Sequence, residues 1–272
     1  MYPYELFWGI HLYGVMIALG VLLCILFLRF SAKKIGIDNK FMDFFEMNAY
    51  IAIAVGFFAS AVWQGVYNYI ENPLNGFNLN GGITFIGGLI GGVIAFFIGW
   101  FVYGMKRYKG KLIEGLMIAP ACIALAHGFG RIGCFFAGCC YGKPTDSWLG
   151  VVFPKGSPSY SVFGEGVAVY PTQLFEAIFL FILFGIMAYL LLKKKFRYNF
   201  CIYLVGYGIW RFFIEFLRAD DRGEFVGSLS PSQFWSIVMV VLAIPVYIMT
   251  KKSFEKKDIL EKSKEITNAE KA

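Results

Sequence analysis

Long apolar runs separated by short polar segments make up most of this 272-residue chain. About 20 consecutive apolar residues in a helix cross a hydrocarbon layer that is about 30 Å thick. Runs of that length predict seven membrane-spanning helices, at about residues 8–29, 44–69, 82–103, 112–137, 172–192, 199–217 and 232–250. The first run is longer than the apolar part of a signal peptide and no A-x-A pattern follows it, so we expect it to remain as a helix.

The runs follow one another without a repeat or a linker, so the pattern predicts an all-α integral membrane protein with one membrane domain over residues 1–250. Residues 138–171 are rich in Gly, Pro, Ser and Tyr and are too long for a simple connector. We expect them to form an outward-facing, extracytoplasmic head region. Residues 251–272 are charged and poor in apolar side chains, and we expect a cytoplasmic tail that is helical in solvent or disordered.

Composition agrees with this class, because 58% of the residues are hydrophobic, 19% are aromatic and only 16% are charged. The net charge of +7 does not indicate a nucleic-acid partner, because the basic residues do not follow one face. They fall in alternate segments between the apolar runs, at 29–40, 106–111, 193–197 and 251–257. The positive-inside rule then predicts an outside N-terminus and a cytoplasmic C-terminus, with membrane lipids and no nucleic acid as partners.

Ionisable residues inside the apolar runs are the first candidates for function, because an unpaired charge in hydrocarbon is costly. Arg211, Glu215 and Arg218 recur at helical spacing, which places them on one face of the sixth helix. That face must point into the protein. Arg211 and Glu215 form either a structural ion pair or part of a functional site, and Arg218 at the helix end is expected to snorkel to the membrane interface.

Arg131 lies between two glycines near the outward end of the fourth helix, where the backbone can approach a neighbour or a ligand closely. A guanidinium group binds phosphate through two parallel hydrogen bonds, and phospholipid headgroups supply phosphate at this depth. We therefore expect Arg131, with Arg211 as a second cation, to hold a lipid phosphate. A buried salt bridge to Glu176 or Glu215 is the alternative, and two such pairs would leave the arginines no positive charge to spare.

Residues 87–92 read GGLIGG and contain two overlapping G-x-x-x-G patterns near the start of the third helix. Such patterns let two helices pack closely. Tight helix packing is the interpretation we favour over a ligand-binding surface built on Gly87 and Gly88.

Short motifs recur along most of the chain, namely LYG at 12–14, YN at 67–68, GGLIG at 87–91, GRIGxF at 130–135, YGxPT at 141–145, YPTQLFE at 170–176 and RFxIEFLR at 211–218. In this order they resemble the motifs of the bacterial prolipoprotein diacylglyceryl transferases. The resemblance implies an enzyme of the bacterial cytoplasmic (inner) membrane that uses no cofactor. It would move the diacylglyceryl group of phosphatidylglycerol to the lipobox cysteine thiol of a lipoprotein precursor and release glycerol phosphate.

The resemblance also carries roles to individual positions. Arg131 and Arg211 match the arginines that bind the lipid in the family, and Arg211 is expected to act in catalysis as well. The other matched positions are Tyr13 as a catalytic residue, Gly142 without an assigned role, and Gly87, Gly88, Gly133, Gln173, Glu176 and Glu215 as substrate-binding residues.

The sequence departs from the family on the side that receives the lipid. Ile86 stands where the family has a histidine, and Ser60 lies near the position of an expected arginine. Cys134, Ala137 and Cys139 replace two asparagines and a glutamate. Two alternatives therefore stay open: a paralogue that modifies another extracytoplasmic acceptor, and a lipid-binding or thiol-redox membrane protein without transferase activity.

Three of the six cysteines lie inside apolar runs and are expected to pack as small hydrophobic residues, namely Cys24, Cys122 and Cys201. Cys134, Cys139 and Cys140 instead gather beside Arg131, and four interpretations are open. Thiolates next to a cation can act as nucleophiles or redox groups, which is the role we assign to Cys139 and Cys140. The others are a zinc site completed by His127, at a spacing that is not standard, a disulfide from Cys134 to Cys139 or Cys140, and plain packing.

His127 precedes Arg131 by four residues and Cys134 by seven, so the three share one helical face. An imidazole there can replace the missing family histidine as the general base that takes the acceptor's proton. A core histidine with satisfied hydrogen bonds is the alternative.

Overall fold

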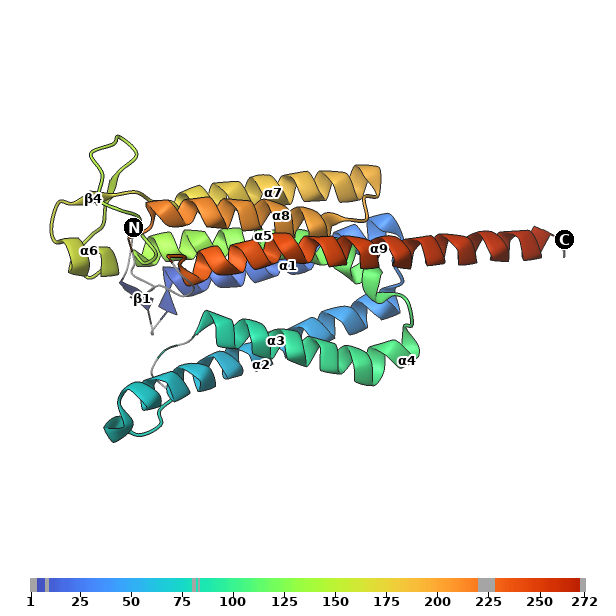
Figure 1. Cartoon of the computed structure of the whole chain (residues 1–272), viewed down its shortest axis with the longest axis horizontal. Coiled ribbons are helices and arrows are strands. Elements are labelled where there is room, and N and C mark those ends of the chain that lie inside the picture. Colours follow the sequence, from blue (N-terminus) through green and yellow to red (C-terminus); the bar gives the residue numbers. More distant parts are fainter. Residues whose placement is uncertain (1–3, 8–9, 80–81, 83, 220–227, 270–272) are drawn as a thin grey trace. The chain divides into compact units, whose positions relative to one another are not determined.

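The computed structural model of the chain describes residues 4–7, 10–79, 82, 84–219 and 228–269 (Figure 1). In these residues seven helical segments are long and apolar enough to cross a membrane. They are α1 (Leu12–Ile35), α2 (Asn39–Glu71), α3 (Phe85–Gly99) with η2 (Trp100–Gly104) and α4 (Met105–Arg107), α5 (Leu112–Ala137), α7 (Thr172–Lys194), α8 (Asn199–Ile214) with η3 (Glu215–Leu217), and α9 (Pro231–Ala269). The predicted all-α, seven-span membrane fold is confirmed.

The helix ends differ from the predicted spans. The first helix begins at Leu12 rather than at residue 8, because Ile10–His11 (β2) pairs antiparallel with Glu5–Phe7 (β1). Helix α2 continues into polar residues at both ends, since backbone hydrogen bonding does not stop where the apolar side chains stop. Helix α9 continues to Ala269, so the predicted tail is helical as far as that residue, and residues 270–272 lie outside the described residues.

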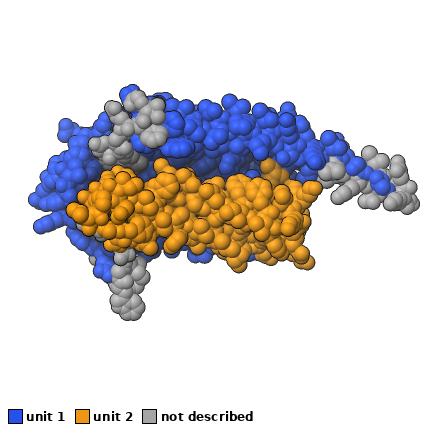
Figure 2. Space-filling model, turned by 60° about the horizontal axis from the view of Figure 1, so that its bottom comes forward, with its two compact units in different colours: residues 1–35, 116–272 blue, residues 36–115 orange. Residues whose placement is uncertain are grey.

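The chain forms two compact units (Figure 2). Unit 1 comprises residues 1–35 and 116–272, and unit 2 comprises residues 36–115. Of the expected site residues, only Gly87 and Gly88 belong to unit 2. The single membrane domain over residues 1–250 stays a prediction.

Helices α2 and α3 of unit 2 pack so closely that glycines of one helix contact the backbone of the other. A Cβ added at Gly56 of α2 would lie 2.9 Å from the carbonyl oxygen of Gly88 in α3, and one at Gly92 would lie 3.2 Å from the carbonyl oxygen of Ala52. The Ser60 hydroxyl also donates to the Thr84 carbonyl at 2.6 Å, just before α3 begins. The packing interpretation of the GGLIGG stretch is confirmed, whereas substrate binding by Gly87 and Gly88 stays a prediction.

Replacing Gly56 with leucine is expected to lower the free energy of unfolding by about 1–3 kcal/mol, because the backbone atom that it meets cannot move aside. Thermal unfolding of the purified protein in detergent measures the loss. Gly185→Leu is the matched control, since Gly185 in α7 is exposed and a Cβ there has no neighbouring heavy atom within 4 Å. Equal losses in both variants would contradict a role for close α2–α3 packing in stability.

The core of unit 1 is formed where α5, α7 and α8 meet. Its fully or nearly buried members are Ala121, Ala124, Leu180, Leu183, Met187 and Tyr207. Helix α9 lies against α8, where a Cβ on Gly208 would be 3.0 Å from the carbonyl oxygen of Ser236. These contacts fix the three helices that carry the charged residues of the expected site.

The segment at 138–171 is folded. Val151–Val152 (β3) pairs antiparallel with Ala168–Val169 (β4), and the short helix α6 (Pro158–Phe163) lies between them in sequence. A small apolar cluster of Tyr141, Phe153 and Val169 supports it. Gly142 forms a bridge with Arg218 at the end of α8 and η3, and a Cβ at Gly142 would lie 2.8 Å from the carbonyl oxygen of Leu217. The segment is therefore more than a connector, and its outward position stays a prediction.

Candidate functional site

Four polar side chains from α5, α7 and α8 form one buried network. Nε of Arg131 lies 3.1 Å from Oε2 of Glu176 and donates to Nε2 of His127 at 3.2 Å. The Tyr207 hydroxyl donates to Oε1 of Glu176 at 2.7 Å. Glu176 is fully buried. The buried salt bridge between Arg131 and Glu176, one of the two pairings considered from the sequence, is present.

The hydrogen bond between Arg131 and His127 determines the state of the imidazole. Because an arginine Nε only donates, Nε2 of His127 accepts, and the neutral ring carries its proton on Nδ1. The single hydrogen on Nε of Arg131 is directed to His127, so Oε2 of Glu176 accepts no hydrogen bond from the described residues although it lies in ion-pair distance. His127 thus orients Arg131 in this arrangement, and its role as a general base stays a prediction.

The terminal nitrogens of Arg131 are not used by the protein. Among the described residues, none forms a hydrogen bond with Nη1 or Nη2 of Arg131, and 15% of its side chain is exposed. Two adjacent N–H groups in a fixed fork match the oxygens of a phosphate. The salt bridge to Glu176 and a phosphate contact are therefore compatible, since they use different nitrogens.

Arg211 is arranged in the same way at the end of α8. Its Nη2 lies 2.7 Å from Oε2 of Glu215 and donates to the Ser232 hydroxyl at 2.7 Å, while its buried Nη1 has no hydrogen-bond partner in the described part of the chain. The predicted Arg211–Glu215 ion pair is confirmed. Glu215 also accepts from the Ser230 hydroxyl at 2.9 Å, so α9 holds this end of the site together.

The expectation that Arg218 snorkels to the interface is wrong. Only 2% of its side chain is exposed, and its Nε lies 3.8 Å from the same Oε2 of Glu215. The reason is the bridge between Gly142 and Arg218, which places the start of the folded 138–171 segment against this helix end. Glu215 therefore has guanidinium groups from both Arg211 and Arg218.

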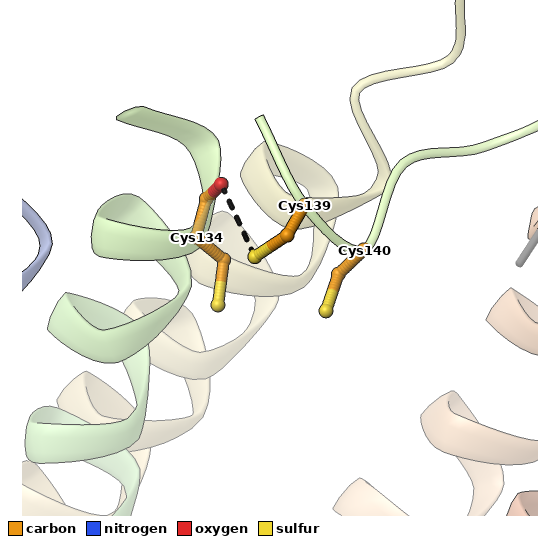
Figure 3. Close-up of side chains that lie close together, drawn as sticks. All are labelled: Cys134, Cys139 and Cys140. Atoms are coloured by element: carbon orange, nitrogen blue, oxygen red, sulfur yellow. Dashed lines mark hydrogen bonds between the residues drawn. The ribbon is translucent and has the colours of Figure 1, made fainter. Parts of the chain in front are cut away.

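The three clustered cysteines lie at the end of α5, with Cys134 in its last turns and Cys139 and Cys140 on the turn that follows the helix (Figure 3). Their three sulfur atoms lie within 4.8 Å of one another, and all three thiols are free. The first residues of α7 hold the turn, because Gln173 Nε2 donates to the carbonyl of Cys139 at 2.6 Å and the Thr172 hydroxyl donates to the carbonyl of Cys140 at 2.8 Å. Gln173, expected to bind substrate, thus positions the cysteines.

The sulfur cluster does not include His127, which bonds to Arg131 instead. The proposed set of three cysteines and His127 is therefore wrong, because the imidazole points to the arginine one helical turn later. Among the three thiols, contacts with the sulfur atoms of Cys134 and Cys139 and the positive charges of Arg218 and Arg131 hold the pKa of Cys140 below its usual value. Cys140 is thus the thiol that ionises most readily.

Tyr13 joins this region from α1. A Cβ on Gly133 would lie 3.0 Å from Cδ2 of Tyr13, so the ring lies directly over the turn of α5 that carries Cys134. Every expected site residue apart from Gly87 and Gly88 lies in unit 1. Tyr207 was missed by sequence reasoning, although its position four residues before Arg211 places it on the same helical face.

Known proteins are similar to this chain over most of its length. The sequence profile described as prolipoprotein diacylglyceryl transferase matches residues 4–249. A phosphatidylglycerol–prolipoprotein diacylglyceryl transferase of Clostridium tetani is 35% identical over 239 residues, which cover 88% of this chain and 92% of the relative. The protein named phosphatidylglycerol–prolipoprotein diacylglyceryl transferase 2 of Clostridium perfringens is 35% identical over 89% of this chain and 91% of its own length. The corresponding transferase of Dehalococcoides mccartyi is 32% identical over 90% and 91%.

Proposed function

The chain belongs to the prolipoprotein diacylglyceryl transferase family, and on this premise we propose that it transfers the diacylglyceryl group of phosphatidylglycerol to the lipobox cysteine thiol of a lipoprotein precursor. Its relatives carry names that state this donor and this acceptor. The observation that carries the proposal is the pair of unused terminal nitrogens on Arg131 beside a carboxylate that already fixes the rest of its guanidinium group.

The reaction needs a cation where the leaving group departs. The acceptor sulfur attacks the glyceryl carbon that carries the phosphate, the C–O bond breaks, and its electron pair leaves with glycerol phosphate. Negative charge therefore grows on the phosphate, which Nη1 and Nη2 of Arg131 would bind, while Arg211, whose Nη1 is buried and unpaired, would add its positive charge. Preorganised donors aimed at a developing charge lower the barrier most effectively.

The buried network of Arg131, His127 and Glu176 can also accept the proton of the acceptor thiol. Oε2 of Glu176 is 3.1 Å from Nε of Arg131 and accepts no hydrogen bond from the described residues. A small rotation of the guanidinium group on phosphate binding would move the Nε hydrogen from His127 to Glu176. Nε2 of His127 would then have a free lone pair for the thiol proton.

The proposed setting is the bacterial cytoplasmic membrane, with the N-terminus outside and the C-terminus cytoplasmic. The basic segments that alternate along the chain support this orientation. This orientation would place the folded 138–171 segment outside, where an extracytoplasmic acceptor docks. Membrane lipids, and no nucleic acid, would be the other partners.

One second candidate is a paralogue that transfers the same lipid group to a different acceptor. It is favoured by the residues that differ from the family on the side that receives the lipid, Ile86 and Cys134 among them.

Expression of this chain in bacterial cells depleted of their own diacylglyceryl transferase is expected to restore diacylglyceryl-modified lipoproteins, measured by mass spectrometry of their N-terminal peptides. The purified chain is expected to release glycerol phosphate from phosphatidylglycerol only when a lipobox peptide is present. Arg131→Ala is the negative control. A stably inserted chain that neither rescues the cells nor modifies the peptide would refute the thiol acceptor, and labelled lipid on another molecule would establish the second candidate.

A further inference from the structure

We propose that Cys134, Cys139 and Cys140 bind one zinc ion whose fourth coordination position takes the acceptor thiol. The inference rests on the proposed function, because that function makes the acceptor a thiol. It also explains why cysteines replace family residues on the side that receives the lipid, since the zinc ion would supply the acceptor as a thiolate.

The positions of the sulfur atoms fit a single ion. Three sulfurs bound to zinc at about 2.3 Å lie roughly 3.8 Å from one another. The three Sγ atoms here already lie within 4.8 Å of one another, and the three side chains project into the same space (Figure 3). We expect rotations about the side-chain bonds to close the remaining gap. The three residues are half-buried, so an ion and an incoming thiol can both reach them.

The backbone explains how two neighbouring cysteines can point to one ion. Cys140 has φ of +61°, in the left-handed region that residues other than glycine rarely adopt. This conformation turns the side chain of Cys140 to the same side as that of Cys139. The hydrogen bonds from Gln173 and Thr172 to the two cysteine carbonyls hold the turn in place. The side chains of the two neighbouring cysteines therefore do not diverge in this turn (Figure 3).

The ligand set leaves one position for a substrate. In the described part of the chain, no histidine, aspartate or glutamate joins the three thiols. Zinc sites with three protein ligands hold water or substrate in the fourth position, whereas structural sites have four protein ligands. Three thiolates and Zn²⁺ carry a net charge of about −1, and the positive charges of Arg218 and Arg131 act on this cluster. The surroundings therefore favour the loaded site.

A zinc-bound acceptor also avoids a chemical difficulty of the covalent alternative. If Cys139 or Cys140 attacked the donor, the product would be a thioether on the enzyme, and no second thiol would displace it readily. Bound to zinc, the acceptor loses its proton to solvent or to a base and becomes a thiolate. Its sulfur forms the new C–S bond while the C–O bond to phosphate breaks, and glycerol phosphate leaves with the electron pair. The neutral thioether product then gives way to water on the metal.

Metal analysis of the full-length protein, purified in detergent and washed with a weak chelator, tests the site directly. We expect about one zinc per chain. Cys134→Ser, Cys139→Ser and Cys140→Ser are each expected to weaken zinc binding by at least about 100-fold, since even outer-shell changes cost 10–100-fold. Cys201→Ser is the matched control, because Cys201 lies in α8 outside the cluster and its thiol donates to the Ala243 carbonyl at 3.8 Å.

Cobalt substitution tests the open position. Co²⁺-loaded protein is expected to show thiolate-to-metal absorption that increases when a lipobox peptide with one cysteine is added. The same peptide with serine in place of that cysteine is expected to leave the absorption unchanged. Metal-free protein with unchanged transfer, or a disulfide from Cys134 to Cys139 or Cys140 found by mass spectrometry in the active protein, would overturn the zinc site and leave the proposed function intact. Zinc binding with a peptide response but no lipid transfer would support the site and refute the proposed function.

Discussion

Replacing Arg131 with lysine is expected to lower kcat/KM for diacylglyceryl transfer by about 10²- to 10³-fold, the usual effect of losing one preorganised donor at a developing charge. Lysine keeps the positive charge but has a single nitrogen. That nitrogen can either remain with Glu176, where Nε now lies 3.1 Å from the carboxylate, or reach the phosphate. It cannot replace the two parallel N–H groups that arginine offers.

The measurement is the initial rate of peptide modification in mixed micelles of phosphatidylglycerol and detergent. Arg107→Lys is the matched control, because Arg107 is exposed in α4 of unit 2 and belongs to no part of the site. The control is expected to keep the wild-type rate. An Arg131→Lys variant that folds and turns over at the wild-type rate would show that bidentate contact by Arg131 does not contribute to catalysis.

The membrane spans were predictable because the length of each apolar run can be determined from consecutive residues alone. The same holds for contacts within one helix: Arg211 with Glu215, and His127 with Arg131, follow directly from spacing of four residues. The first helix began later than predicted, at Leu12, because strand β2 pairs with β1 and a hydropathy window does not report such pairing.

Contacts between helices were not predictable from spacing. The sequence left Glu176 and Glu215 as equal partners for Arg131, and only the packing of α5 against α7 selects Glu176. The turn with the left-handed backbone at Cys140 is likewise held by residues far along the chain. The hydrogen bonds from Thr172 to Cys140 and from Gln173 to Cys139 join residues that are 32 and 34 positions apart. The zinc interpretation with His127 was wrong for a different reason: the imidazole accepts from Arg131, a contact within one helix that the spacing of four residues already allowed.

Replacing Glu176 with alanine is expected to lower the free energy of unfolding by about 3–5 kcal/mol, the usual cost of leaving a buried charge without its partner. Glu176 is fully buried, and it serves both Arg131 and the Tyr207 hydroxyl, so its removal leaves a cation and a donor unsatisfied at once. Unfolding of the purified protein in detergent, followed by circular dichroism, measures the loss.

Stability and catalysis can then be separated with the double variant Arg131→Met, Glu176→Met. Removing both charges together and filling their volume is expected to recover most of the stability, because an ion pair replaced by apolar side chains is often neutral or stabilising. Activity of the double variant is expected to be absent, since the phosphate would have no guanidinium group from α5. A double variant as unstable as Glu176→Ala would show that the loss comes from packing or from Tyr207, and a double variant that still transfers lipid would remove Arg131 from the mechanism.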